Sequence, residues 1–478
     1  MIINLEQRHG KLIASYINKE GDISYSQFNV PIQQQYMWGY SRQKNKSDRD
    51  FMSWDKQPVA KIPCQFLNKQ RAQEFFMDAG ENMVSQLFEQ NTPKLYSCDI
   101  EVDVTDDGFA EASDATNRIN TIAWTHYPDI YVFGLKELNG EQCTDIERRI
   151  NEHVKKFNRK YNFIYKYHAN EADMLYDFLY NYARHAPLIT GWFFWAYDWQ
   201  YIINRCKRLN LDISWMSPTR QWYQHRILDR NKKIQISLPQ HKLIVDYMTI
   251  YKKWDRSVEI KENSTLDFVA DTALGIKKVN YSGTLQDLYN KDYDKYVFYN
   301  AIDSVLVELL DGKLKTMSTF LSLGNITKVE SMDAFSPIQM LLATMTRYAY
   351  KKNIVFPKTN DHKEREEYEG AFVHEPIPGL YNWVASFDFK GLYPSIMLQF
   401  KISIENFLFK DKNHIPNDKQ IKCVSGAVFD INEEPLIPEI IKDFFDKRIE
   451  TKKISVTAEK ESYRLKKILE ERKSKINI

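Results

Sequence analysis

Strand-like and helical stretches alternate along the chain between residues 95 and 315. The strand-like stretches are rich in β-branched and aromatic residues and lie at 118–125, 130–133 and 187–190. The helical stretches lie at 171–185, 197–208 and 295–310. This alternation predicts an α/β domain, because helices that follow strands can cover the faces of a sheet.

The segment before this domain has a different pattern. Residues 1–94 contain short alternating runs at 11–17 and 23–30, and a helical stretch at 69–89. This predicts a small β-rich domain, which the mostly helical residues 316–359 are expected to complete. The chain of 478 residues is long enough for roughly two to four domains, so the expected fold class is α/β multidomain.

The last third of the chain predicts two further parts. A β-rich stretch is expected from residue 370 to residue 388, which places Asp388 at the end of a strand. After a break at Pro435 and Pro438, residues 440–475 form a charged, helical pattern with a thin apolar stripe. A helix of this kind buries little by itself and is marginal in water.

The composition is that of a globular protein, with 43% hydrophobic and 27% charged residues. Aromatic residues make up 14%, which indicates large cores more often than base-stacking surfaces. The net charge of +2 says little about nucleic acid, so any basic groove is expected to be local.

The cysteines and the apolar segments indicate the cellular compartment in which the protein is expected. The five cysteines are scattered without a C-x-x-C pair, which argues against zinc and disulfides and favours a reducing compartment. Residues 1–10 carry Glu6 and Arg8 in place of an apolar core, which is unlike a signal peptide. The most apolar run, 188–197, is too short to span a membrane. We therefore expect a cytoplasmic protein with no membrane partner.

Two acidic residues, Asp99 and Glu101, lie in the strand-like stretch 95–104. Side chains alternate across a strand, so both carboxylates are expected on one face. They would repel one another unless a cation lay between them, and hard divalent cations prefer such oxygen ligands. The alternative is a solvent-exposed edge strand with acidic residues.

Two further acids lie in distinctive surroundings. Asp198 follows the aromatic run 192–197, where it can ligate a cation or simply cap the helix that follows. Asp303 is expected on a helix, four residues after Tyr299, so the two side chains share a face. A phenol there can orient a water for attack on phosphorus, and the alternative is a tyrosine packed beside an ordinary acid.

Together these residues resemble the proofreading domain of family B DNA polymerases, especially the tailed-bacteriophage branch. The D-I-E motif of that family is matched by residues 99–101, its aromatic-Asp-x-x-Tyr motif by 197–201, and its Y-x-x-x-D motif by 299–303. The stretch 243–253 is similar to another part of that domain. The resemblance implies a ribonuclease H-like 3′→5′ exonuclease domain with a mixed sheet over residues 95–315.

By this resemblance, two Mg²⁺ ions are bound by the metal ligands Asp99, Glu101, Asp198 and Asp303. Tyr299 joins them as a catalytic residue. Relatives usually have Asn at the position of Phe193, and this departure leaves the carboxylates intact but can alter strand binding or rate.

The segment 386–396, S-F-D-F-K-G-L-Y-P-S-I, resembles the first polymerase motif of the same family. The resemblance implies that Asp388 is catalytic and ligates two Mg²⁺ ions. It implies that backbone N–H groups of a turn bind the triphosphate, from Phe389, Lys390, Gly391, Leu392 and Tyr393. Tyr393 would exclude a 2′-hydroxyl, and Gly391 stands where relatives often have Ser.

Two weaker similarities lie on either side of this segment. Tyr368, Gly370 and Ala371 resemble a short family motif that contacts template DNA. Arg448 and Lys452 have the spacing at which relatives bind the nucleotide phosphates. The alternative for these two is a solvated basic helix face.

The remaining family motifs, K-x-x-x-N-S-x-Y-G and D-T-D, do not occur in the chain. The resemblance therefore predicts a partial α+β palm over 360–434 and one long, truncated fingers helix over 435–478. We expect the N-terminal subunit of a split, phage-type DNA polymerase used in viral DNA replication in the host cytoplasm. The expected partners are a second polymerase chain, primer-template and single-stranded DNA, deoxynucleoside triphosphates (dNTPs) and, through the second chain, a sliding clamp.

Two other functions stay open. A stand-alone 3′→5′ DNA exonuclease that has lost polymerase activity would need no second chain. A nucleic-acid-binding regulator without catalysis would bind through the N-terminal domain, and the matched exonuclease motifs argue against it.

Overall fold

A computed structural model describes residues 1–41, 47–80, 84–104, 108, 110–229, 232–255, 263–277, 279, 283–358, 372–389 and 391–476. The chain forms two compact units. The first unit comprises Met1–Ile32 and Ala79–Leu341, and the second comprises Gln33–Asp78 and Leu342–Ile478. The domain boundaries expected from the sequence stay predictions.

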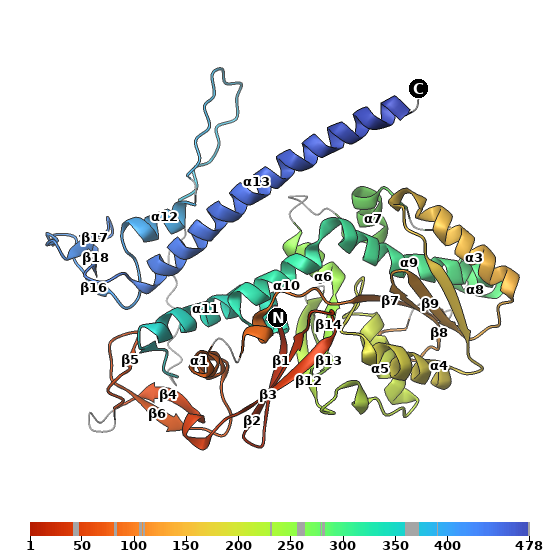
Figure 1. Cartoon of the computed structure of the whole chain (residues 1–478), viewed down its shortest axis with the longest axis horizontal. Helices are drawn as coiled ribbons and strands as arrows, with labels where there is room; N and C mark the ends of the chain where they lie inside the picture. The colour runs from red at the N-terminus through yellow and green to blue at the C-terminus, as the bar shows by residue number, and fades with distance from the viewer. Residues whose placement is uncertain are drawn as a thin grey trace. The chain divides into compact units, whose positions relative to one another are not determined.

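A six-stranded mixed sheet forms the centre of the first unit among the described residues (Figure 1). Its strand order is β10-β9-β8-β7-β11-β14. The neighbours β7, β8 and β9 are antiparallel, whereas β11 and β14 run parallel to β7, and β10 runs parallel to β9. The bounds are β7 (Leu95–Val102), β8 (Ile119–His126), β9 (Asp129–Gly134), β10 (Asn162–Tyr167), β11 (Leu188–Gly191) and β14 (Leu243–Asp246). The expected mixed sheet is confirmed.

Helix α9 (Tyr293–Leu314) packs against β7, β8 and β9 and is buried along most of its length. Asp292 caps its first turn, since its side chain accepts a hydrogen bond from the backbone N–H of Lys295. The other helices of this unit are η3 (Ser85–Phe88), α3 (Gly140–His153), η4 (Lys155–Phe157), α4 (Glu171–Asp177), the π-helix η5 (Phe178–Tyr182), η6 (Ala183–His185), α5 (Asp198–Arg208), η7 (Ser214–Met216), α6 (Tyr247–Trp254), α7 (Leu266–Leu274), α8 (Leu285–Lys291), α10 (Thr316–Thr327) and η8 (Ser331–Phe335).

Two smaller β-structures complete the first unit. The N-terminal strands β1 (Ile2–Arg8), β2 (Lys11–Ile17) and β3 (Ile23–Asn29) form an antiparallel sheet, which confirms the β-rich start of the chain. The hairpin of β12 (Trp222–Asp229) and β13 (Lys232–Pro239) follows α5 in the chain. The buried side chain of His241, just beyond this hairpin, contacts Ser15 Oγ and Glu6 Oε2, each at 2.9 Å. These contacts join the N-terminal sheet to the rest of the unit.

The second unit consists of small sheets and helices. The paired strands are β4 (Tyr36–Tyr40) with β6 (Val59–Pro63), β5 (Met52–Ser53) with β15 (Ile354–Val355), and β16 (Phe407–Lys410) and β17 (Gln420–Lys422) with β18 (Ala427–Asp430). Its helices include α1 (Lys69–Ala79), α12 (Leu392–Gln399) and α13 (Leu436–Ile476). Two further helices, η1 (Ile32–Gln34) and α11 (Pro337–Lys351), lie partly in each unit, and α1 crosses the boundary at its last residue, Ala79.

Two expectations from the sequence were wrong in this region. The single helix expected over 69–89 ends at Ala79, where Gly80 has a φ of +83°, a conformation that stops a helix. The strand expected before Asp388 does not form, since residues 372–389 are exposed and pair with no described strand. A strand needs a neighbour for its backbone hydrogen bonds, and the described residues supply none here. The expected long helix is confirmed by α13.

Candidate active site

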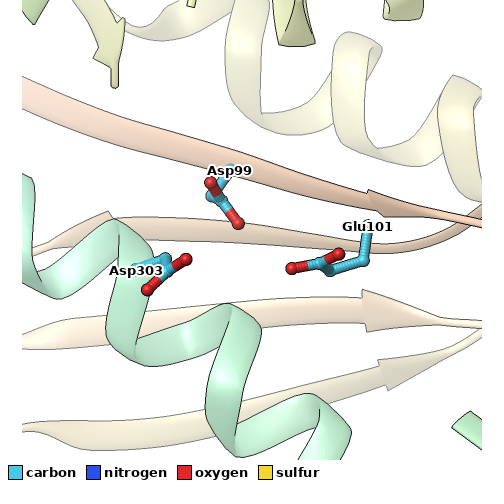
Figure 2. Close-up of side chains that lie close together, drawn as sticks. All are labelled: Asp99, Glu101 and Asp303. Carbon is cyan, nitrogen blue, oxygen red and sulfur yellow. The ribbon is translucent and has the colours of Figure 1, made fainter. Parts of the chain in front are cut away.

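Strand β7 carries two of the candidate carboxylates near the middle of the central sheet. Asp99 and Glu101 lie on the same face of β7, as the alternation of side chains requires, and Glu101 is buried. Ligand oxygens of Asp99, Glu101 and Asp303 all lie within 4.8 Å of one another. Figure 2 shows these carboxylates facing a common space, two from the strand and one from α9. We call these three residues the acidic cluster.

Helix α9 supplies the third carboxylate of the cluster together with its neighbours. Asp303 is buried, and Tyr299, one helical turn before it, is partly buried. Asn300 is fully buried, and its Nδ2 donates a hydrogen bond to Asp99 Oδ2 at 2.7 Å. Sequence reasoning missed Asn300, although its position three residues before Asp303 places it on the same side of the helix.

Asp198, the fourth predicted ligand, lies outside the acidic cluster. It begins α5, and its Oδ1 accepts a hydrogen bond from the backbone N–H of Ile100, the residue between Asp99 and Glu101. The pKa of Asp198 is raised from 3.8 to about 7, mainly by burial and also by the nearby charges of Asp246 and Asp303, whereas its hydrogen bonds to backbone N–H groups act to lower it. The structure thus brings together three of the four predicted carboxylates and places the fourth beside their strand.

Asp246 is a second buried acid that the sequence reasoning did not single out. It ends β14 and caps α6, and it accepts hydrogen bonds from the Thr249 hydroxyl at 2.8 Å and the Met248 backbone at 3.0 Å. It also accepts from the backbone N–H of Phe194, at 3.3 Å. Burial raises its pKa to about 6. Because Phe194 belongs to the loop between β11 and α5, Asp246 anchors the segment that leads to Asp198.

The loop between β11 and α5 starts beside the strand of the cluster. A Cβ on Gly191 would lie 2.4 Å from the backbone oxygen of Cys98, so only glycine allows β11 to approach β7 this closely. Phe193 has a φ of +60°, a left-handed conformation that Asn adopts more readily than Phe. An Asn, which the family resemblance leads one to expect at this position, would adopt this conformation with less strain than Phe.

The donor set of the acidic cluster fits a hard divalent cation. Carboxylate oxygens are the ligands such cations prefer, and the cluster brings three carboxylates from two elements together. Two of the three residues are buried, and buried like charges repel strongly without a cation. The residues present therefore fit the Mg²⁺ that the sequence motifs imply.

The residues expected to bind the nucleotide lie in the second unit. Asp388 and Phe389 are exposed at the end of the irregular segment 372–389. Gly391 has φ +64° and ψ +57°, and α12 begins directly after it, with Tyr393 in its first turn. Glycine adopts this left-handed conformation without strain. Lys390, Tyr368, Gly370 and Ala371 lie outside the described residues.

The basic pair of Arg448 and Lys452 on α13 lies on the helix face that contacts the turn at Gly391. A Cβ on Gly391 would lie 3.1 Å from Phe445 Cζ, so Phe445 packs against the turn. Arg448 and Lys452 follow Phe445 by three and seven residues and therefore share its side of the helix. Both side chains are exposed, and neither forms an ion pair with a described residue.

Among the described residues, no helix is both long and apolar enough to cross a membrane.

Comparison with known proteins matches both parts of the chain. The model of the family "DNA polymerase family B, exonuclease domain" matches residues 20–290. The model "DNA polymerase family B" matches residues 334–478. The exonuclease match includes β7 with Asp99 and Glu101 and the start of α5 with Asp198, whereas Asp303 lies beyond it.

The similar curated proteins are mostly viral and cellular DNA polymerases. The chain is 28% identical over 408 residues to the DNA-directed DNA polymerase of Escherichia phage RB69, covering 79% of this chain and 44% of that protein. It is 27% identical over 417 residues to the enzyme of Enterobacteria phage T4, covering 80% and 45%. A 148-residue stretch is 31% identical to the DNA polymerase delta catalytic subunit of Caenorhabditis elegans, covering 30% and 14%.

The chain spans about half the length of the phage polymerases that it matches. It contains the exonuclease domain and part of the polymerase domain. The family models, together with the acidic cluster, show that the chain belongs to DNA polymerase family B.

Proposed function

We propose that this chain is a Mg²⁺-dependent 3′→5′ exonuclease that removes nucleotides from DNA ends. The observation that supports this most directly is the acidic cluster of Asp99, Glu101 and Asp303 within an exonuclease domain of family B. The cluster has the oxygen ligands that divalent cations require, and phosphodiester hydrolysis uses such cations.

The residues divide the work of hydrolysis among them. Asp99, Glu101 and Asp303 hold the cations, and Asp198 adds a fourth carboxylate in its ionised form. Two bound Mg²⁺ ions would supply an activated water and stabilise the leaving 3′ oxygen. Tyr299 lies one turn from Asp303 and orients the attacking water. The raised pKa of Asp198, about 7, favours activity at neutral to alkaline pH, because only the carboxylate form binds a cation.

The experiment follows 5′-labelled single-stranded DNA incubated with the purified chain and Mg²⁺. A 3′→5′ exonuclease gives a ladder of shortened, labelled strands. Asp99→Ala combined with Glu101→Ala is expected to lower the rate by about 1,000-fold or more, because metal assistance contributes several kcal/mol. The matched control changes two exposed acids of the same unit, Glu137→Ala with Glu141→Ala, and retains the rate.

Two results would contradict this proposal. If the double variant of the cluster degrades DNA as fast as the unchanged chain, the acidic cluster is not the active site. If the unchanged chain binds single-stranded DNA but does not degrade it under any divalent cation, the chain acts as a nucleic-acid-binding regulator instead.

We also propose that residues 388–393 form half of a nucleotidyl-transfer site for a proofreading DNA polymerase. The support is the turn at Gly391, which opens α12 next to the basic face of α13. Backbone N–H groups at such a helix start can bind the triphosphate of a dNTP, while Arg448 and Lys452 add positive charge. Asp388 supplies one carboxylate for two catalytic Mg²⁺ ions.

Nucleotidyl transfer with two metal ions also needs a second carboxylate. The sequence contains no Asp-Thr-Asp motif, and Phe387, Phe389 and Tyr393 are largely exposed, at 93%, 75% and 69%. We propose that a second polymerase chain covers this surface, supplies the missing carboxylate and carries the contact to a sliding clamp. Primer-template DNA and dNTPs would bind at the nucleotidyl-transfer site only in the completed enzyme.

Pull-down of the tagged chain from infected or host cells tests this. The expected co-purifying protein contains an Asp-Thr-Asp motif, and the pair extends a primed template with dNTPs and Mg²⁺. In the pair, Asp388→Ala abolishes extension and retains exonuclease activity, while Tyr393→Ala admits ribonucleotides. If the chain alone extends the primer, a second chain is not needed. If it degrades DNA in cells with no such partner, it is a stand-alone exonuclease.

A further inference from the structure

Asn300 is a buried amide whose nitrogen has a hydrogen-bond partner and whose oxygen has none among the described residues. Its side chain lies in α9 with no solvent exposure, and its Nδ2 donates to Asp99 Oδ2 at 2.7 Å. Its Oδ1 is buried and accepts no hydrogen bond from any described residue. An unpaired buried acceptor costs about 1–3 kcal/mol, so most such groups in proteins have a partner.

The chemistry of Asp99 fixes the orientation of this amide. An ionised carboxylate only accepts hydrogen bonds, so the NH₂ group of Asn300 has to face Asp99 and its carbonyl oxygen has to face elsewhere. That oxygen is attached to the same carbon as Nδ2 and therefore stays beside the acidic cluster. Asp303, another cluster residue, lies three residues further along α9, on the same side of the helix.

We propose that Asn300 is a positioning residue of the cation site, with a separate role for each end of its amide. Its NH₂ group holds the Asp99 carboxylate in the orientation that binds the cation. Its carbonyl oxygen accepts a hydrogen bond from a water bound to that cation. Mg²⁺ retains several waters when it binds to proteins, and these waters are strong donors that need acceptors. This inference rests on the proposed function, since it requires a cation in the acidic cluster.

Manganese binding to the full chain, measured by calorimetric titration, tests the inference without relying on catalysis. Asn300→Leu keeps the approximate volume and removes both polar atoms. Loss of a residue that orients a metal ligand typically weakens binding by about 10- to 100-fold, and we expect a dissociation constant higher by that factor. Asn300→Ala is expected to show the same loss and serves if the Leu variant does not fold.

The matched control is Asn325→Leu in α10. Asn325 is also buried, and its Oδ1 also accepts no hydrogen bond from the described residues, but it lines a cavity with Gln90 and Ser322 rather than the acidic cluster. The control is expected to bind Mn²⁺ like the unchanged chain. Thermal unfolding of the Asn300→Leu and Asn325→Leu variants with a chelator present measures their folding stability apart from cation binding. A lower unfolding midpoint shows a general folding defect, whereas an unchanged midpoint with weaker Mn²⁺ binding shows a defect in cation binding.

A further variant distinguishes failure of this inference from failure of the proposed function. Asp99→Asn combined with Asp303→Asn is expected to abolish Mn²⁺ binding. If this double variant binds Mn²⁺ normally, the cluster is not the cation site, and both proposals are wrong. If it loses binding while the Asn300 variants bind like the unchanged chain, only the role of Asn300 is wrong. Exonuclease activity of the Asn300 variants that recovers with excess Mn²⁺ would support the positioning role.

Discussion

At the scale of single residues, Asp198 shows how surroundings change the properties of an acid. Its carboxylate is buried beside Asp246 and accepts a hydrogen bond from Ile100, and its pKa of about 7 lies well above the usual 3.8. The folded chain therefore binds a proton at this group more tightly than the unfolded chain. Without a cation, the contribution of Asp198 to the free energy of unfolding should fall as the pH rises from about 4 to about 7.

Asp198→Asn is expected to remove this contribution. Asn stays neutral, so without divalent cations the variant gains stability relative to the unchanged chain at pH 8 and not at pH 4, where the carboxyl is protonated in the folded state. Urea unfolding in the presence of a chelator at both pH values measures this difference. Equal effects of the substitution at both values would show that Asp198 is ionised throughout. The same variant should have little exonuclease activity.

At the scale of secondary structure, the spacing of β7 and β11 decides where the cluster lies. Gly191 is the last residue of β11, and its Cα lies against the backbone of Cys98, the residue before Asp99. Any side chain at position 191 has to push two neighbouring strands apart, because backbone atoms cannot rotate away as a side chain can.

Gly191→Ala is expected to lower the free energy of unfolding by about 1–3 kcal/mol, since overpacking of a tight interior costs this much. It should also reduce exonuclease activity through displacement of Asp99. Gly140→Ala is the control: Gly140 starts α3, and a Cβ there meets nothing within 4 Å. That change is expected to stabilise the chain by about 0.4–1 kcal/mol. Denaturant unfolding of both variants measures these changes in the free energy of unfolding. If Gly191→Ala leaves this free energy unchanged, β11 does not approach β7 as closely as the structure shows.

The tertiary packing of helix α13 changes along its length. Leu436 and Ile440 are buried with Ala349, whereas Ile454 and Leu469 are 64% and 55% exposed. Tertiary packing supplies most helix stability, so the first turns should be stable and the later ones should fray.

Hydrogen exchange measures this gradient directly. Backbone amides of residues 440–446 are expected to exchange more slowly than those of residues 455–472 by at least tenfold. If the proposed second polymerase chain also packs on this helix, its addition should slow exchange in the later turns. Uniform protection along the free helix would show that its exposed part is stable without a partner.

At the scale of the whole molecule, the chain forms two compact units. The acidic cluster lies in the unit formed by Met1–Ile32 and Ala79–Leu341, and Asp388 lies in the other. A ligand stabilises only the folded part that binds it, by RT ln(1 + [L]/Kd), about 2.7 kcal/mol at one hundred times the dissociation constant.

Calorimetric unfolding is therefore expected to show two transitions. Mn²⁺ should raise the midpoint temperature of only one of them. Fragment mapping by limited proteolysis at intermediate temperature should identify the stabilised unit as the one with the cluster. The variant with Asp99→Asn and Asp303→Asn should lose the shift. An equal shift of both transitions would show that the units unfold together or that cations bind outside the cluster.

Local patterns predicted many elements correctly because their signals lie within a few residues. The alternation of Asp99 and Glu101 on one strand face and the helical spacing of Tyr299 and Asp303 both follow from backbone geometry. The strand expected before Asp388 failed because strand formation depends on hydrogen bonds to a neighbour that local sequence does not specify.

The sequence by itself predicted four of the six strands of the central sheet, β7, β8, β9 and β11, and the residue types that can bind a cation. Only the tertiary structure decided that Asp99, Glu101 and Asp303 lie together, that Asp198 lies beside them with a raised pKa, and that Asn300 contacts Asp99. The reason is that these relations join residues about one hundred to two hundred positions apart. Their distances depend on how α9 and the loop before α5 pack on β7, which no local pattern encodes.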